Sequence, residues 1–94
     1  MKSYELAVIL RADKEETEVK RDVEGIRAFL EKIDGCEVVN MDPWNRRKLA
    51  YPIEKQIFGF YVIFDLKASP TAIQHLREEL ALNTTILRFM VVAK

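Results

Sequence analysis

The feature that most constrains the fold of this chain is the order in which strand-like and helix-like apolar periods follow one another. Residues 3–11 alternate with a period of two, which predicts a strand with one buried face. Asp13, with Glu16 three residues later, predicts a helix N-cap, and Gly35 predicts the end of that helix. The apolar stripe between them recurs at helical steps of four and three: Val19, Val23, Ile26, Leu30 and Ile33.

The second half of the chain has two extended segments before its helix. Residues 36–53 predict one long, kinked strand, and residues 60–68 predict another. The residues between them, 54–59, are expected to form the turn. Ser69 before Pro70 predicts an N-cap followed by proline at the first helical position. A second helix should therefore start there, with its stripe at Ile73, Leu76 and Leu80.

Residues 84–92 predict the last strand, so the order is β-α-β-β-α-β in a single expected domain of residues 1–94. This order in about a hundred residues predicts an α+β, ferredoxin-like sandwich, with four antiparallel strands in the order 4-1-3-2 and both helices on one face. The other face should be open and mostly apolar, which is typical of a partner-binding surface. Strand parity places these apolar residues on it, beside Glu5, Asp65 and Arg88: Ala7, Ile9, Tyr61, Ile63, Ile86, Met90 and Val92.

Charge and cysteine content narrow the classes of function. The 15 Lys and Arg balance the 15 Asp and Glu, which argues against sequence-blind nucleic-acid binding. The cations are uneven, because residues 1–40 hold seven against ten acids and residues 41–94 hold eight against five. A single cysteine excludes an internal disulfide, and neither a signal peptide nor a membrane span is recognisable. A cytoplasmic location is therefore expected.

No catalytic or metal-binding set can be assembled from the sequence. His75 has no ligand at metal spacing, and Cys36 has neither a base nor an oxyanion site to make it a nucleophile. An acylphosphatase, a small ferredoxin-like hydrolase, would need a glycine-bearing, arginine-ended phosphate loop after the first strand, and "RADKEE" lacks it. We therefore expect no enzymatic activity, no metal and no cofactor.

An RNA recognition motif has the same strand order and is the alternative function, as a stand-alone module that binds single-stranded RNA. Its third strand carries an octamer with aromatic positions for base stacking. Aligned on Gly59, this chain fits the octamer at Gly59, Phe60 and Ile63 and fails at four positions. The aromatics of this strand are therefore interpreted as core residues.

The densest cationic point lies in the stretch "NRRKLAYPI", residues 45–53. Leu49 and Ile53 are expected in the core, while Tyr51 should reach outward beside the cations. Charge can simply guard an edge strand against aggregation, but arginine can also fork onto phosphate and tyrosine can stack on bases. The residues alone leave both interpretations open for the three consecutive cations: Arg46, Arg47 and Lys48.

This stretch resembles the signature of the bacterial small-subunit ribosomal protein number six family. That signature runs glycine, any residue, basic, polar or charged, leucine, alanine or serine, tyrosine, any residue, isoleucine. The matching positions are Arg47, Lys48, Leu49, Ala50, Tyr51 and Ile53. Asn45 stands where the family usually has glycine, and asparagine also tolerates positive φ. The start "YELAVIL" and the end "LRFMVV" resemble the family's first and last strands, so nearly the whole chain is covered.

The resemblance implies a non-catalytic structural component of the bacterial small ribosomal subunit. It implies binding to the central domain of the small-subunit ribosomal RNA as a heterodimer with small-subunit protein number eighteen, with no small-molecule substrate. The RNA-binding residues that it implies are Lys2, Tyr4, Arg46, Arg47, Lys48, Tyr51 and Arg88. The protein partner is expected on the open face, at Ile9, Tyr61, Ile63 and Met90.

Overall fold

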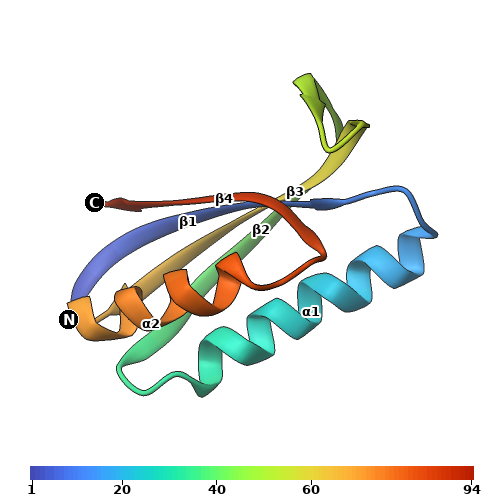
Figure 1. The fold of residues 1–94 in the computed structure, drawn as a ribbon. Helices are drawn as coiled ribbons and strands as arrows, with labels where there is room; N and C mark the ends of the chain where they lie inside the picture. Colours follow the sequence, from blue (N-terminus) through green and yellow to red (C-terminus); the bar gives the residue numbers. More distant parts are fainter.

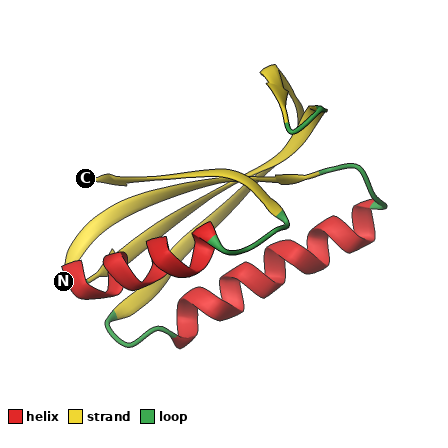
Figure 2. Cartoon of the chain, viewed as in Figure 1, coloured by secondary structure: helices red, strands yellow, loops and turns green.

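The computed structural model describes residues 1–94 as one antiparallel sheet with two helices packed on the same face (Figure 1). Figure 2 shows both helices on one side of the strands and short connections between most elements. The strand order β2-β3-β1-β4 is the predicted order read from the other edge, which confirms the ferredoxin-like fold. The elements are β1 (Lys2–Arg11), α1 (Glu16–Lys32), β2 (Cys36–Ile53), β3 (Gln56–Ala68), α2 (Pro70–Ala81) and β4 (Ile86–Ala93).

The core lies between the sheet and the helices. Alternate residues of β1 and β3 face the helices, and Leu6, Val62 and Phe64 have no exposed surface. Each helix contributes one stripe, in which Leu30 of α1 and Leu76 of α2 are also fully buried. The predicted period-two and helical patterns therefore meet in one cluster of buried side chains.

Helix α1 begins later than its acidic start predicts. The N-cap is Glu15, which makes no side-chain capping hydrogen bond, so the prediction of Asp13 as N-cap is wrong. The first buried residue of the helix is Val19, so the helix starts one turn before its first core residue. Lys14 instead turns toward the helix, with its Nζ 2.6 Å from the Oδ2 of Asp22.

Gly35, which follows α1 in the chain, is hydrogen-bonded to the N-cap residue of α2. Its φ of 81° lies in the left-handed region that glycine adopts without strain. Its carbonyl accepts the backbone N–H of Ser69 at 2.9 Å. The Ser69 hydroxyl accepts the N–H of Ala72 at 3.2 Å, with Pro70 in the first helical position, so the predicted start of the second helix is confirmed.

A register shift between β1 and β4 corrects the predicted open face. Ile9 pairs with Arg88, but the next residue, Leu10, pairs with Ile86, so Leu87 is an extra residue on β4. This bulge turns Ile86 into the core, where its side chain is 8% exposed. The prediction that Ile86 lies on the open face is therefore wrong.

Strands β2 and β3 continue past the rest of the sheet as a hairpin, which rises on the side away from the helices (Figure 1). Its turn consists of only Glu54 and Lys55, with φ values of 48° and 68°, so the predicted turn over 54–59 is too long. Positive φ at both positions is typical of the two-residue turn that matches strand twist. The register between β2 and β3 shifts between Lys48 and Ile53, and the hairpin bends there.

The base of this hairpin packs on the open face of the sheet. Leu49 is 6% exposed, so its predicted burial is confirmed, although it lies outside the main cluster of buried side chains. Ile53 is half-buried, so its predicted core position is wrong. Gly59 lies beneath the contact. A Cβ atom at Gly59 would stand 2.5 Å from Ile9 Cγ2 and 3.2 Å from Leu49 Cδ2. The missing side chain lets the hairpin approach β1 closely.

We expect Gly59→Ala to lower the free energy of unfolding by about 1–3 kcal/mol, because the added methyl group overpacks the base of the hairpin. Urea unfolding measures the change. Gly25→Ala is the matched control, because a Cβ atom at this position of α1 meets nothing within 4 Å. The control should be neutral or stabilising by up to about 1 kcal/mol. A Gly59→Ala variant as stable as wild type would contradict this packing.

An ion pair joins β3 to the last residue of the chain on the open face. Lys94 Nζ lies 2.6 Å from Asp65 Oδ1. The hydrogen bond and the charge of Lys94 lower the pKa of the Asp65 carboxyl, and a hydrogen bond from Asn40 adds to this effect. The same hydrogen bond raises the pKa of the Lys94 ammonium.

The lowered pKa of Asp65 predicts a pH-dependent contribution to stability. The contribution is fully present above the pKa of the unfolded carboxyl, about 3.9, and is lost as the pH falls through the lower folded-state pKa. We expect Asp65→Asn to lower the unfolding free energy at pH 7, with the difference from wild type shrinking below about pH 4. The same substitution in a Lys94→Ala background should have a much smaller effect. An effect of equal size at pH 7 and pH 2 would contradict the assignment.

Candidate nucleic-acid interface

The three consecutive cations of β2 lie on both faces of an edge strand. Arg46 and Lys48 pair with Phe60 and Phe58 of β3, which places them on the helix-covered side of the sheet. Arg47 lies between them and points to the open side, because successive residues of a strand alternate. All three cations are exposed.

Asn45 sets the path of the backbone into this cationic segment. Its φ is 66°, and the register of β2 shifts between Pro43 and Asn45. Trp44 lies in this bulge, where its indole N–H donates to Asp42 at 3.0 Å and its carbonyl accepts Arg47 Nε at 3.2 Å. The position that holds glycine in the family signature therefore requires a residue that tolerates a left-handed backbone.

Each arginine of the predicted RNA-binding set lies over an aromatic ring. These contacts hold a planar guanidinium group, and its N–H donors stay available for phosphate, except for Arg47 Nε, which donates to the Trp44 carbonyl. No carboxylate forms an ion pair with any of these arginines. The distances from guanidinium carbon to ring centroid are 4.1 Å for Arg46 on Phe58, 5.2 Å for Arg47 on Trp44 and 5.4 Å for Arg88 on Tyr51.

The contact of Tyr51 with Arg88 brings the two edges of the sheet together. Arg88 belongs to edge strand β4, whereas Tyr51 belongs to the hairpin that extends from the opposite edge. They meet because the hairpin bends over the open face (Figure 1). Arg88 pairs with Ile9, and Ile9 pairs with Tyr61, so this contact borders the predicted partner face.

The four residues predicted to contact a protein partner are neighbours on the open face. Ile9 pairs with Tyr61, and Ala7, two residues away on β1, pairs with both Ile63 and Met90. The side chain of Met90 is 60% exposed, and the other three predicted residues are half-buried. The structure therefore forms a continuous apolar patch from residues on three strands.

Two predicted RNA-binding residues lie far from the hairpin. Lys2 pairs with Ala68 at the end of β1 opposite to Arg11. Nine steps of about 3.3 Å along the strand place Lys2 roughly 30 Å from that end. Tyr4 is half-buried and packs against the core on the helix side. The structure does not bring these residues together with the arginines, and their role stays a prediction.

Phe58 contacts one of the predicted RNA-binding residues, although the sequence interpretation assigned it to the turn. It continues the alternation of Phe60, Val62 and Phe64 by one step toward the hairpin, beyond the part of β3 that the helices cover. Its side chain is 38% exposed, and Arg46 lies over it. The sequence signal that could have placed Phe58 in β3 is the period of two, which continues toward Gln56, the first residue of the strand.

The aromatic residues deeper in β3 do not form a base-stacking platform. Phe60 is 4% exposed and Phe64 is fully buried, both on the helix side, so their interpretation as core residues is confirmed. A stacking platform needs exposed rings on the open face. Tyr61 is the one aromatic residue of β3 on that face, and it is half-buried.

The residues considered for catalysis and for metal binding do not form a site. Burial raises the pKa of the Cys36 thiol, which opposes the thiolate form that a nucleophile needs. His75 is exposed on α2, in a shallow groove between the helices. No three His, Cys, Asp or Glu side chains are grouped so that they could hold a metal ion. No helix is long and apolar enough to cross a membrane.

Comparison with known proteins matches almost the entire chain. The small ribosomal subunit protein bS6 of Saccharopolyspora erythraea is 39% identical over 94 residues, which cover 100% of this chain and 79% of that protein. The same protein of Clostridium novyi is 38% identical over 92 residues, covering 98% of this chain and 96% of that protein.

The backbone fold agrees with this sequence similarity. The crystal structure of 30S ribosomal protein S6 from Thermotoga maritima superposes with a TM-score of 0.90 over 99% of this chain and 87% of that chain; at 22% identity, this shows the shared fold. The family model described as Ribosomal protein S6 matches residues 3–93, including the β2 signature and both outer strands. With this coverage and identity, the chain belongs to the ribosomal protein S6 family.

Proposed function

We propose that this protein binds the central domain of the small-subunit ribosomal RNA, as a structural component of the small ribosomal subunit and in a heterodimer with small-subunit protein number eighteen. Its relatives are ribosomal proteins of that subunit, which supports a structural rather than a catalytic role. The observation that carries the proposal is the set of three arginines, each held over a ring and free of carboxylate partners.

The distribution of charge over the two sides of the sheet also supports RNA binding. Many of the acids lie on α1 and directly before it, on the helix side of the sheet, whereas the hairpin rises on the other side (Figure 1). Arg47 and Arg88 lie on the open side, whereas Arg46 lines a groove with Glu15 and Glu16. A protein of zero net charge can then present Arg47 and Arg88 to phosphate on the side away from its acidic helix. Phosphate contacts would supply affinity, and the fixed spacing of the guanidinium groups would select RNA shape.

The apolar patch on the open face supports a protein partner beside the RNA. Met90 and Val92 are 60% and 47% exposed on the outer strand β4. A partner that covers this patch would also border Arg88, which lies next to it in the sheet. A basic partner would share in neutralising the phosphates, which fits the zero net charge of this chain.

We expect the triple substitution of Arg46, Arg47 and Lys48 by alanine to leave the fold intact, since all three side chains are exposed, and to abolish joining to RNA. The slope of log affinity against log salt should flatten by roughly 0.7 to 0.9 for each lost phosphate contact. Binding is measured on a central-domain fragment of small-subunit ribosomal RNA, with protein number eighteen present.

The matched control removes the same charge from α1 by replacing Lys20, Arg21 and Lys32 with alanine. These residues are exposed on α1 and are not part of the candidate site. The control variant should keep nearly all of the affinity. If the β2 triple variant joined the RNA as well as wild type did, the proposed site would be wrong.

Met90→Glu tests the proposed partner face. A buried, unpaired carboxylate should weaken association with protein number eighteen by roughly tenfold or more. Isothermal titration calorimetry measures this affinity in the absence of RNA. Leu82→Glu is the control, because Leu82 is 77% exposed at the end of α2, away from the open face. Equal affinity of Met90→Glu and wild type would place the partner elsewhere.

A further inference from the structure

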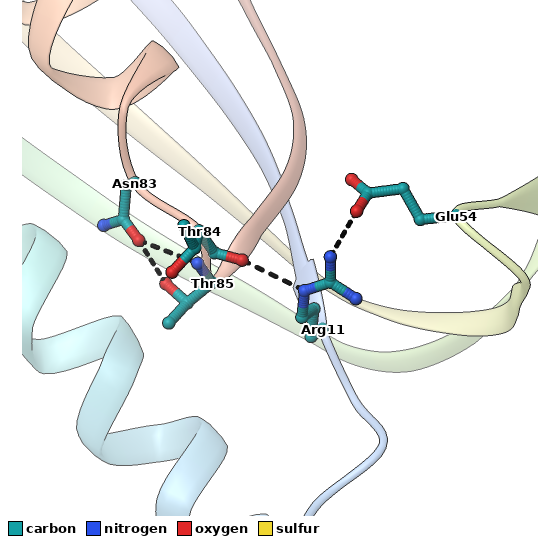
Figure 3. Close-up of polar contacts among 5 residues, drawn as sticks. All are labelled: Arg11, Glu54, Asn83, Thr84 and Thr85. Carbon is teal, nitrogen blue, oxygen red and sulfur yellow. Dashed lines mark hydrogen bonds and ion pairs between the residues drawn. The ribbon is translucent and has the colours of Figure 1, made fainter.

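We propose that Arg11 and Glu54 are positioning residues, which hold the β2–β3 hairpin in the orientation that places Tyr51 against Arg88 in the candidate RNA site. This inference rests on the proposed function, because it assigns a role in RNA binding to two residues outside the family signature. It starts from one side chain of β1 that contacts two other segments of the fold (Figure 3).

Arg11 is the last residue of β1, and its guanidinium group is shared between two partners (Figure 3). Nε donates to the carbonyl of Thr84 at 3.0 Å, in the loop between α2 and β4. Nη2 donates to the carboxylate of Glu54, in the hairpin turn. The backbone N–H of Arg11 also donates to the Thr85 carbonyl at 2.9 Å. The hairpin turn is thus tied to the body of the sandwich.

The loop on the other side of Arg11 is itself held in place. Asn83 Oδ1 accepts the backbone N–H of Thr85 at 2.9 Å and the Thr85 hydroxyl at 2.6 Å (Figure 3). This local turn fixes the direction of the neighbouring Thr84 carbonyl. Arg11 therefore links the hairpin to a constrained acceptor rather than to a free loop.

Two features of the hairpin leave its orientation weakly fixed without such a link. Between Lys48 and Ile53 its β2 strand loses register with β3, so fewer ladder hydrogen bonds fix its angle there. Its turn places two residues with side chains, Glu54 and Lys55, at positive φ, a conformation that persists where surrounding contacts support it. The ion pair of Glu54 with Arg11 is such a contact.

The location of Glu54 is otherwise unfavourable for a surface that binds phosphate. It is the only acidic residue between Asp42 and Asp65, in the segment that carries the cationic signature. A carboxylate there repels RNA unless it has another role. Holding the turn in place is such a role. Removal of the carboxylate then tests the proposal, because loss of repulsion and loss of positioning change the RNA affinity in opposite directions.

Glu54→Ala removes a negative charge near the proposed RNA site. Electrostatics alone predicts tighter RNA binding, whereas positioning predicts binding weaker by about three- to tenfold. Binding is measured with the same ribosomal RNA fragment and protein number eighteen at fixed salt. Glu37→Ala removes an exposed carboxylate from the far end of β2 and should not weaken binding. Equal or tighter binding by Glu54→Ala would overturn the proposal.

A readout without RNA tests the orientation directly. In wild type, the ring current of Tyr51 should displace the NMR signals of the Arg88 side chain, because the two groups are in contact. We expect Glu54→Ala and Arg11→Lys to reduce this displacement, since a single ammonium group cannot reproduce the forked contact. Unchanged Arg88 signals in both variants would overturn the positioning role.

If the proposed function were wrong but the positioning role were right, the NMR and RNA-binding experiments would disagree. The Arg88 signals would still depend on Glu54, while the β2 triple-alanine variant bound RNA as wild type does. That result would overturn RNA binding by the hairpin, and with it the RNA role of Arg11 and Glu54.

Discussion

The close packing of Leu49 and Ile9 over Gly59 is the contact on which the rest of the site depends. Without a side chain at Gly59, the long β2–β3 hairpin can lie close over the open face at its base and bend there. The bend brings Tyr51 from one edge of the sheet to Arg88 on the other. A position without a side chain thus determines where two side chains of the predicted RNA-binding set meet.

The sandwich beneath the hairpin separates two kinds of surface. The helices bury their apolar stripes against one face of the sheet and carry many of the acids on their outer side. The other face keeps an apolar patch with Arg47 and Arg88, each over an aromatic ring, while Arg46 lies on the helix side of edge strand β2. A chain with balanced charge can therefore present a cationic and apolar surface to its proposed partners while its acidic side faces away.

Local periodicity predicted the fold, whereas contacts between distant segments corrected the details. The strand and helix patterns each needed only a short window of sequence, so the order and the core followed from them. Ile86 was misplaced because a bulge changes parity, and Ile53 because it pairs with Gln56, beyond the part of β3 that pairs with β1. The family resemblance implied the three arginines, but the link between Arg11 and Glu54 depends on a tertiary contact that no short pattern encodes.

The most direct test of the central claim is the NMR response of the arginine side chains when central-domain ribosomal RNA is added with protein number eighteen. We expect the Nε–H signals of Arg46, Arg47 and Arg88 to shift or broaden at the first additions. Arg21 on α1 and Arg77 on α2 are exposed on the helix side, and their signals should stay unchanged. A response centred on the helix arginines, with the hairpin signals unmoved, would contradict RNA binding through the hairpin.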